Sequence, residues 1–413
     1  MTKLKISPFA PSAFSSLLPI PGFTMATAET GMKYKNRADL WVFHGCPGTQ
    51  IAGVFTKNLC PGHPVVWSKK ALNVQTGGPR LLIVNSGVAN VFGGKKGKDA
   101  ITKIALSCAK EFGVESNSVI FASTGIIGEA LDASKIISHL PDINKNLSDA
   151  GWSKAAEAIM TTDTYPKCSS ATATINGVPV RINGIAKGSG MIAPDMATML
   201  SFVATDANLS AGVLQNLLNL IVQDTFNSIT VDSDTSTSDT LLLMASCTAQ
   251  HNKINDPSDA RLQSFIEALR SVMMDLALQV VKDGEGISKF IKISIKGAVS
   301  NSSAKVIGLS VANSPLVKTA ISGEDANWGR VVMAVGKSGE PAERDKLSIF
   351  MGPYAIADGG SISKDYDEKK VSLYMQNSEI DLVVDLGLGT GEARLYTCDL
   401  THDYISINTD YRS

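Results

Sequence analysis

The sequence has almost no net charge and no block of like charges. Its 413 residues include 38 lysines and arginines and 39 aspartates and glutamates, a formal net charge of −1. The densest group, Lys95-Lys96-Gly97-Lys98, is short enough to be a solvated loop. Without an excess of positive charge, the chain has no electrostatic footprint for nucleic acid, so we exclude a nucleic-acid-binding function.

Cysteine and histidine are few and scattered. The chain has six cysteines and five histidines, with no CxxC pair and no HExxH motif. Six separate cysteines in a chain this long are not the disulfide framework of a small secreted domain, and none has the spacing of a zinc site. We therefore predict free thiols in a reducing compartment, no metal site and no cofactor.

Long apolar runs are also absent. A membrane-spanning helix needs about 18 or more consecutive apolar residues, and no run approaches that length. Near the N-terminus, Lys3 and Lys5 precede a mildly apolar stretch, which Pro8, Pro11 and Pro19 interrupt, unlike a secretory signal. With 44% hydrophobic and 19% charged residues, the composition is that of a globular protein. We expect a soluble, cytoplasmic protein with one large or two ordinary domains and no membrane contact.

Strand-like and helix-like patterns alternate along the whole chain, which predicts a mixed α/β fold. Apolar residues recur at helical spacing in some segments and in short runs or strict alternation in others. The elements that we predict are a buried strand at 81–84, a helix over 101–112 that Gly113 ends, a hairpin turn at Asn176-Gly177, a helix from the N-cap Ser210, a helix from Asp256-Pro257 to Asp283-Gly284, and a half-exposed strand at 291–295.

The stretch KGSGMIAPDMATML, residues 187–200, carries the strongest indication of chemistry. Its glycines and proline enforce an irregular backbone, and a strand-like run starts at Thr198. A threonine there is usually only a good strand former. Its hydroxyl can nevertheless attack a strained preceding carbonyl, shift the acyl chain to oxygen and free Thr198 with an α-amine base beside the hydroxyl. No Ser-His-Asp constellation is visible, so a nucleophile that carries its own base is the economical alternative.

This stretch is similar to the autoprocessing segment of the ornithine acetyltransferase family of arginine biosynthesis, also called glutamate N-acetyltransferases. Further motifs follow the family's order over nearly the whole chain. They are Asn85-Ser86-Gly87, STGIIG at 123–128, TTDT at 161–164, TVDSDTS at 230–236, DGEG at 283–286, GEDANWGR at 323–330, CDLTHDY at 398–404 and Tyr411-Arg412-Ser413.

The resemblance implies a fold and a domain organisation. It implies a four-layer α-β-β-α core like that of N-terminal-nucleophile enzymes, with a smaller α/β lobe at approximately 287–413. Self-cleavage between Ala197 and Thr198 is expected to give an α chain, 1–197, and a β chain, 198–413. The two chains are expected to stay together and to form an α2β2 assembly.

The resemblance also implies the reaction and its residues. Thr198 is expected to take acetyl from N-acetylornithine and to pass it to glutamate, and Thr124 and Gly125 match the family's oxyanion-hole pair. Lysine suits a substrate carboxylate and glutamate a substrate ammonium. Part of the family also acetylates glutamate from acetyl-CoA, and we favour this bifunctional form, with acetyl-CoA as a substrate. The family's substrate contacts map onto Thr161, Lys187, Thr198, Glu285, Asn408 and Ser413.

Three departures from the family pattern and two other functions have to be weighed. Val88, Asp195 and Ala326 replace the commoner asparagine, asparagine and proline, and Asp195 adds a carboxylate near the cleavage point, where it can alter the rate of processing. The alternative enzyme is an N-terminal-threonine amidohydrolase or aminopeptidase, in which water rather than an amine resolves the acyl-enzyme. The non-enzymatic alternative is an amino-acid-binding α/β protein that never cleaves.

Overall fold

The computed structural model describes most of the chain and divides it into two compact units. The residues described are 5–14, 17–74, 77–193 and 199–410. The larger unit consists of Pro11–Asn227 and Asp234–Val280. The smaller unit combines Val281–Tyr411 with two short segments, Met1–Ala10 and Ser228–Ser233. Two segments distant in sequence therefore join the C-terminal region in the smaller unit. The family resemblance had implied only the C-terminal region, at approximately 287–413.

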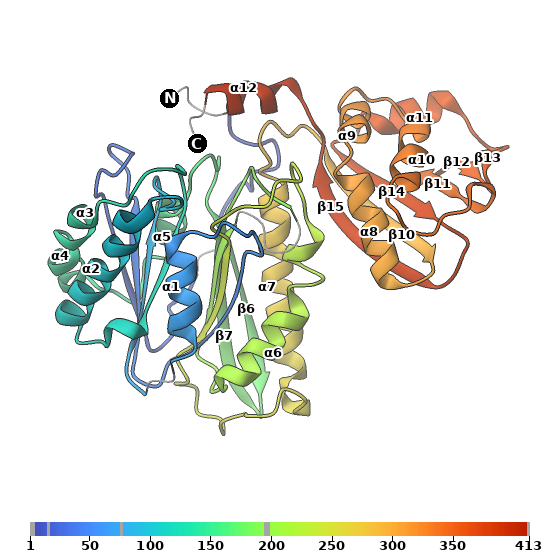
Figure 1. Cartoon of the computed structure of the whole chain (residues 1–413). Coiled ribbons are helices and arrows are strands. Elements are labelled where there is room, and N and C mark those ends of the chain that lie inside the picture. The colour runs from blue at the N-terminus through green and yellow to red at the C-terminus, as the bar shows by residue number, and fades with distance from the viewer. Residues whose placement is uncertain (1–4, 15–16, 75–76, 194–198, 411–413) are drawn as a thin grey trace. The chain divides into compact units, whose positions relative to one another are not determined.

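Two sheets form the centre of the larger unit (Figure 1). In the four-stranded sheet only the last two neighbours, β4 and β5, are parallel. In the five-stranded sheet only β8 and β9 are parallel. The four strands are, in spatial order, β1 (Phe23–Ala28), β2 (Leu40–Gly45), β4 (Arg80–Asn85) and β5 (Val119–Ser123). The five strands are β3 (Gln50–Phe55), β9 (Thr240–Ala245), β8 (Leu200–Thr205), β7 (Val178–Lys187) and β6 (Lys167–Ile175).

Helices cover the outer faces of these sheets, and one helix, residues 152–158, packs into the core between them. Figure 1 shows α2, α3 and α4 on one side of the unit and α6 and α7 on the other. The helices are α1 (His63–Leu72), α2 (Gly94–Phe112), α3 (Ala133–Ile137), α4 (Leu140–Lys145), α5 (Trp152–Ala158), α6 (Ala211–Ile221) and α7 (Gln263–Val281). Short 3-10 turns lie at Ser116–Ser118, Phe226–Ser228, Ala260–Leu262 and Arg344–Lys346.

The side chains of β4 point alternately into two different apolar cores, which explains why the predicted strand at 81–84 is apolar throughout. Leu82 and Val84 belong to the core shared by the two sheets, in which the rings of Trp41 and Phe202 meet at 5.2 Å. The intervening residues of the strand, including Leu81, face the core under α2. A strand covered on both faces has no polar side, which is the pattern the sequence shows.

Local signals placed several elements correctly. Gly113 ends α2 in the left-handed conformation, at φ 65°. Ser210 caps α6, because its side chain accepts a hydrogen bond from the Val213 N–H. Asn176 and Gly177 both have positive φ, as a two-residue hairpin turn between β6 and β7 requires.

The predicted start of the third helix was wrong. Asp256 and Pro257 precede a turn, in which the Asp256 carboxylate accepts hydrogen bonds from the N–H and the hydroxyl of Ser258. The helical region starts at Ala260, where Asp259 accepts from the Arg261 N–H. An aspartate that closes a turn and one that caps a helix have the same local signature, which explains the error.

The smaller unit has a single six-stranded mixed sheet with its own core. Ile291, Ile293 and Ile295 of β10 are buried in this core, and the lysines between and after them are less buried, as the alternation predicted. The strands, in spatial order, are β13 (Ser361–Ile362), β12 (Tyr354–Asp358), β11 (Ser348–Met351), β14 (Glu379–Asp385), β10 (Phe290–Ala298) and β15 (Gly391–Cys398). The helices are α8 (Asn301–Ala312), α9 (Pro315–Ser322), α10 (Trp328–Gly336), α11 (Glu368–Met375) and α12 (His402–Asp410).

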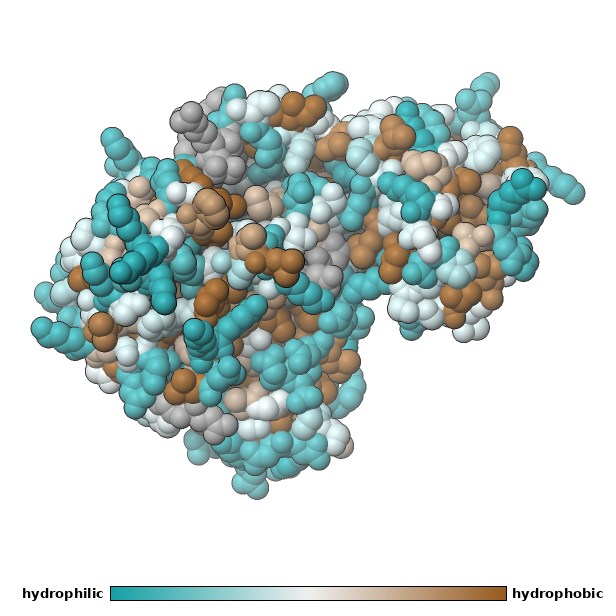
Figure 2. Space-filling model, in the orientation of Figure 1, coloured by the Kyte–Doolittle hydropathy of each residue, from teal (hydrophilic) through white to brown (hydrophobic). Residues whose placement is uncertain are grey.

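The predicted mixed α/β class is confirmed, with three sheets in two units. In the described part of the chain, no helix combines the length and apolarity needed to cross a membrane. On the face drawn in Figure 2, hydrophobic and hydrophilic residues are intermixed on both units. Such mixing is typical of a surface in contact with water.

Candidate active site

The predicted oxyanion-hole residues lie where two parallel strands of the larger unit end. Asn85, the last residue of β4, is opposite Ser123, the last residue of β5. Past these ends, the Thr124 N–H donates to the Asn85 carbonyl at 3.1 Å and the Ile126 N–H donates to the Gly87 carbonyl at 3.0 Å. The motifs Asn85-Ser86-Gly87 and STGIIG, distant in sequence, therefore form one structural feature.

Gly125 can be no other residue in this arrangement. Its φ is +126°, and a Cβ built there would lie 2.2 Å from the Gly87 carbonyl carbon. Within the part of the chain that the structure describes, neither the Thr124 hydroxyl nor the Gly125 N–H makes a hydrogen bond. Two neighbouring donors that no described group of the protein uses are what an oxyanion hole requires.

Thr161 follows α5 and is held next to a buried carboxylate. The Ser86 hydroxyl donates to the carbonyl of Ala158, the last residue of α5, at 2.7 Å, which ties this segment to the Asn85-Ser86-Gly87 motif. Two residues after Thr161, Asp163 folds back and accepts the Thr161 N–H through Oδ2 at 2.9 Å. The TTDT motif thus orders its own first residue.

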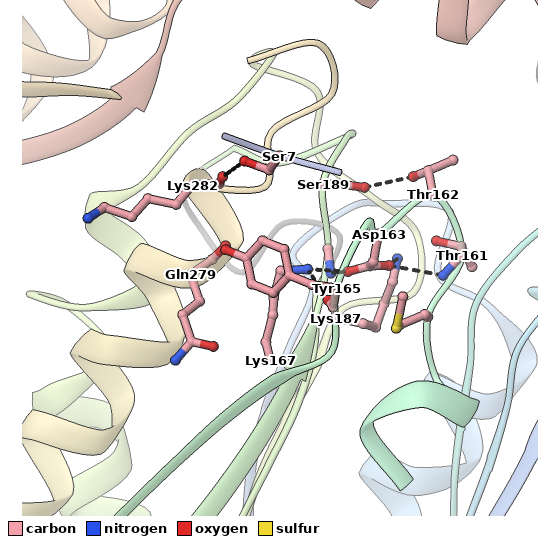
Figure 3. Close-up of polar contacts among 12 residues, drawn as sticks. Ser7, Thr161, Thr162, Asp163, Tyr165, Lys167, Lys187, Ser189, Gln279 and Lys282 are labelled. Atoms are coloured by element: carbon pink, nitrogen blue, oxygen red, sulfur yellow. Dashed lines mark hydrogen bonds and ion pairs between the residues drawn. The ribbon is translucent and has the colours of Figure 1, made fainter. Parts of the chain in front are cut away.

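Asp163 is the centre of a cluster that joins three segments (Figure 3). Its Oδ1 accepts hydrogen bonds from Lys167 Nζ at 2.7 Å and from the Gly188 N–H at 2.6 Å. Lys187 Nζ lies 4.0 Å from Oδ2. Lys167 begins β6 and Lys187 ends β7, so the β6–β7 hairpin delivers both ammonium groups to one carboxylate.

The charge state of this cluster follows from its partners. Burial alone would raise the pKa of Asp163, but the ammonium groups of Lys167 and Lys187 and the Gly188 N–H together hold it below its usual range. The side chains of Asp163 and Lys167 are inaccessible to solvent and that of Lys187 is 3% exposed. Two ammonium groups therefore lie beside one buried carboxylate at the ends of the β6–β7 hairpin.

The segment predicted to be processed is anchored on both sides. Before it, the hydroxyls of Ser189 and Thr162 lie 2.7 Å apart. After it, the Met199 N–H donates to Asp239 Oδ1 at 3.0 Å, and the Thr240 N–H donates to the Met199 carbonyl at 3.1 Å. The predicted nucleophile Thr198, the cleavage partner Ala197 and the departure Asp195 lie outside the described residues.

Asp239 differs from Asp163 in its partners. It is completely buried, and its Oδ2 makes no hydrogen bond in the described ranges. Burial raises the pKa of Asp239 well above its usual value, and the Met199 N–H, the Lys187 ammonium and the Thr56 hydroxyl oppose this rise only in part. Nowhere in the described part of the chain are three or more His, Cys, Asp or Glu side chains grouped as a metal site would need.

The two predicted substrate residues of the smaller unit are in direct contact. Asn408 Nδ2, on α12, donates to Glu285 Oε2 at 2.7 Å. The DGEG turn fits closely under this helix, because the Thr401 hydroxyl donates to the Gly286 carbonyl at 2.7 Å. A Cβ at Gly286 would lie 2.5 Å from the Tyr404 nitrogen. Ser413 lies outside the described residues.

The structure thus places the predicted site residues in two sets. Thr124, Gly125, Thr161 and Lys187 belong to the larger unit, whereas Glu285 and Asn408 belong to the smaller unit. The GEDANWGR motif contributes a helix cap: the Asn327 side chain accepts a hydrogen bond from the Arg330 N–H at the start of α10.

Two buried acids were not assigned a role from the sequence. Asp163 stood inside a motif, but its lysine partners are fixed only by the β6–β7 pairing. Asp239 gave one weak signal, an acid directly before the apolar run of β9.

A family model with the description ArgJ family matches residues 24–413. The chain belongs to the ArgJ family. It is 52% identical over 411 residues to the arginine biosynthesis bifunctional protein ArgJ of Brucella suis biovar 1, covering 99% of both chains. With the ArgJ of Gluconobacter oxydans it shares 52% identity over 410 residues, 99% of this chain and 96% of the relative.

A solved structure adds to the comparison. The crystal structure of the arginine biosynthesis bifunctional protein argJ from Bacillus halodurans is 39% identical, with a TM-score of 0.50, and covers 52% of this chain and 100% of that chain. The family prediction made from the motifs is therefore confirmed, and this ArgJ-family chain is an acetyltransferase of arginine biosynthesis.

Proposed function

We propose that the chain cleaves itself between Ala197 and Thr198 and then transfers acetyl from N-acetylornithine to glutamate through an acetyl-Thr198 intermediate. The observation that carries this proposal is the pair of uncommitted donors at Thr124 and Gly125. The layers of the larger unit, helices outside two packed sheets, support an N-terminal-nucleophile-like α-β-β-α core. The six free cysteines support a cytoplasmic location.

The proposed reaction has two acyl transfers. The Thr198 hydroxyl attacks the acetyl carbonyl of N-acetylornithine while the Thr198 α-amine accepts its proton, and ornithine leaves with that proton on its nitrogen. The amine of glutamate then attacks the acetyl ester, which regenerates the hydroxyl. In both steps the oxyanion forms beside the Thr124 hydroxyl and the Gly125 N–H, each contributing about 3 kcal/mol of transition-state stabilisation.

The charged side chains suit amino-acid substrates. Lys187, held beside Asp163, suits a substrate carboxylate, and Thr161 is bonded to the same acid. Glu285, oriented by Asn408, supports recognition of a substrate ammonium, and Ser413 remains a proposed contact from the family pattern. Acetyl-CoA is the proposed donor for a second reaction, direct acetylation of glutamate, and no cofactor is needed.

Sheet topology supports a stable association of the two cleaved chains. In the five-stranded sheet, β8 and β9 of the proposed β chain lie between β3 and β7 of the proposed α chain. Separating the chains would break the β3–β9 and β7–β8 ladders at once. We propose that these pairs assemble as α2β2.

Intact-mass analysis of the wild-type protein and Thr198→Ala tests self-cleavage. The wild type is expected to give two fragments, the second beginning at Thr198, and the variant a single chain. An uncut wild-type chain that folds would exclude the proposed nucleophile, since its amine base would never form.

Acceptor dependence separates a transferase from an amidohydrolase or aminopeptidase. The cleaved protein is incubated with N-acetylornithine, with and without glutamate, and then with acetyl-CoA and glutamate. Ornithine release that requires glutamate beyond one equivalent supports transfer, because the acyl-enzyme waits for an amine. Continued release without glutamate would favour hydrolysis.

A further inference from the structure

Asp239 has one oxygen in use and one without a partner. Oδ1 accepts the Met199 N–H at 3.0 Å, whereas Oδ2 is buried and makes no hydrogen bond among the described residues. A buried polar atom without a partner is costly, so such atoms in a folded protein call for an explanation. The proposed cleavage creates a new polar group one residue before Met199, whose N–H the other oxygen of this carboxyl accepts.

Covalent geometry limits how far that new group can be. The Met199 nitrogen is bonded to the carbonyl carbon of Thr198, and the Thr198 nitrogen is three bonds away from it. The two nitrogens are therefore within about 4 Å of each other for any backbone conformation. Asp239 Oδ1 in turn lies 3.0 Å from the Met199 nitrogen. The carboxyl is thus next to the residue whose nitrogen changes from an amide to an amine.

We propose that Asp239 is the positioning residue of the nucleophile: Oδ1 holds the chain at Met199, and Oδ2 becomes the partner of the α-amine that cleavage creates at Thr198. This inference rests on the proposed self-cleavage. In its protonated form the new amine pairs with the Asp239 carboxylate, and the neutral amine, formed when this proton is lost, is the base of the proposed reaction.

The groups facing Asp239 come from three elements. Lys187 at the end of β7 interacts with it through its charge, the Thr56 hydroxyl faces it from the segment after β3, and Met199 contacts it from the start of β8. Asp163 and Lys167 lie beyond Lys187. Lys187 therefore interacts with both buried acids, Asp163 and Asp239.

The test compares wild type, Asp239→Asn and the control Ser201→Ala after complete cleavage, verified by intact mass. Asn keeps an acceptor for the Met199 N–H but cannot ionise. Ser201, on β8, is equally buried and its hydroxyl has no partner in the described ranges. The measurement is kcat/KM for N-acetylornithine across pH, whose acidic limb reports protonation of the free enzyme's base.

A carboxylate beside the amine raises the pKa of the amine, so replacing the Asp239 carboxylate with an amide should lower that pKa. We expect the acidic limb of Asp239→Asn to move to lower pH by about one unit, and that of Ser201→Ala to match wild type. An unshifted limb in an active Asp239→Asn enzyme would overturn the proposal. If Asp239→Asn does not fold, the same pH profile is measured on Asp239→Ser. If neither variant folds, Asp239 is a structural residue only and the proposal is rejected. A wild type that does not cleave would instead refute the underlying function.

Discussion

Replacing Asp163 with asparagine is expected to destabilise the larger unit severely. Lys167 Nζ lies 2.7 Å from Asp163 Oδ1 with both side chains inaccessible to solvent, and Lys187 lies at 4.0 Å. The Asn side chain keeps the size but not the charge, so the buried ammonium group of Lys167 loses the carboxylate that it contacts. Removing one partner of a buried ion pair costs about 3–5 kcal/mol. The free energy of unfolding of Asp163→Asn should fall by that amount at pH 7.

An exposed pair in the same unit provides a matched control. Arg270 and Asp224 also lie 2.7 Å apart, but their side chains are 37% and 68% exposed. The same substitution, Asp224→Asn, should cost no more than about 1 kcal/mol, because water screens this pair. Urea denaturation followed by tryptophan fluorescence measures both. Three tryptophans report on the larger unit, Trp41, Trp67 and Trp152.

The pH dependence gives a second, independent readout. Because the folded-state pKa of Asp163 is lowered, its contribution is fully present above the unfolded value, about 3.9, and is lost as the pH falls below it. The stability difference between wild type and Asp163→Asn should therefore shrink by roughly 1 kcal/mol between pH 7 and pH 3. Equal losses for Asp163→Asn and Asp224→Asn, or a difference independent of pH, would refute the reasoning.

Three further predictions concern the oxyanion hole, the smaller unit and the thiols. Thr124→Val should lower kcat/KM for N-acetylornithine about 100-fold to 1000-fold without changing thermal stability, and a loss below tenfold would contradict its role. Asn408→Ala removes the 2.7 Å bond to Glu285 and should raise KM about tenfold with kcat little changed; steady-state kinetics with an unchanged KM would count against it. Iodoacetamide at pH 8 should modify the exposed Cys60 but not Cys108, whose pKa burial raises to about 12; peptide mass spectra showing equal labelling would disprove this.

Local patterns were sufficient where a residue's environment depends on its neighbours in sequence. The helix capped by Ser210 and the turn at Asn176-Gly177 were predicted because hydroxyl caps and left-handed turns have few alternative sequences. At Asp256 the same reasoning failed, since a turn and a helix cap use the same side chain. The pairing of β3 with β9 could not be predicted, because the paired residues are distant in sequence and the local pattern of a strand does not determine which strand it pairs with.

The site residues divide in the same way. Thr124, Gly125 and Lys187 were predicted because motif order matched a family, and their roles stay predictions. Asp163 and Asp239 were not predicted, because their charged partners are brought together only by the fold.

Asp163 and Asp239 demonstrate how far partners, rather than residue type, decide chemistry. Both carboxyls are fully buried and both interact with Lys187, yet the pKa of one is lowered and that of the other raised. Asp163 has two ammonium groups and two backbone N–H donors, which offset burial. Asp239 has one backbone N–H donor, and its other oxygen has no hydrogen-bond partner among the described residues. Asp163 thus holds the two lysines in place, and Asp239 is suited to receive an amine that does not yet exist in the uncleaved chain. Under this reasoning the site contains, before cleavage, the electrostatic environment for the amine that cleavage creates.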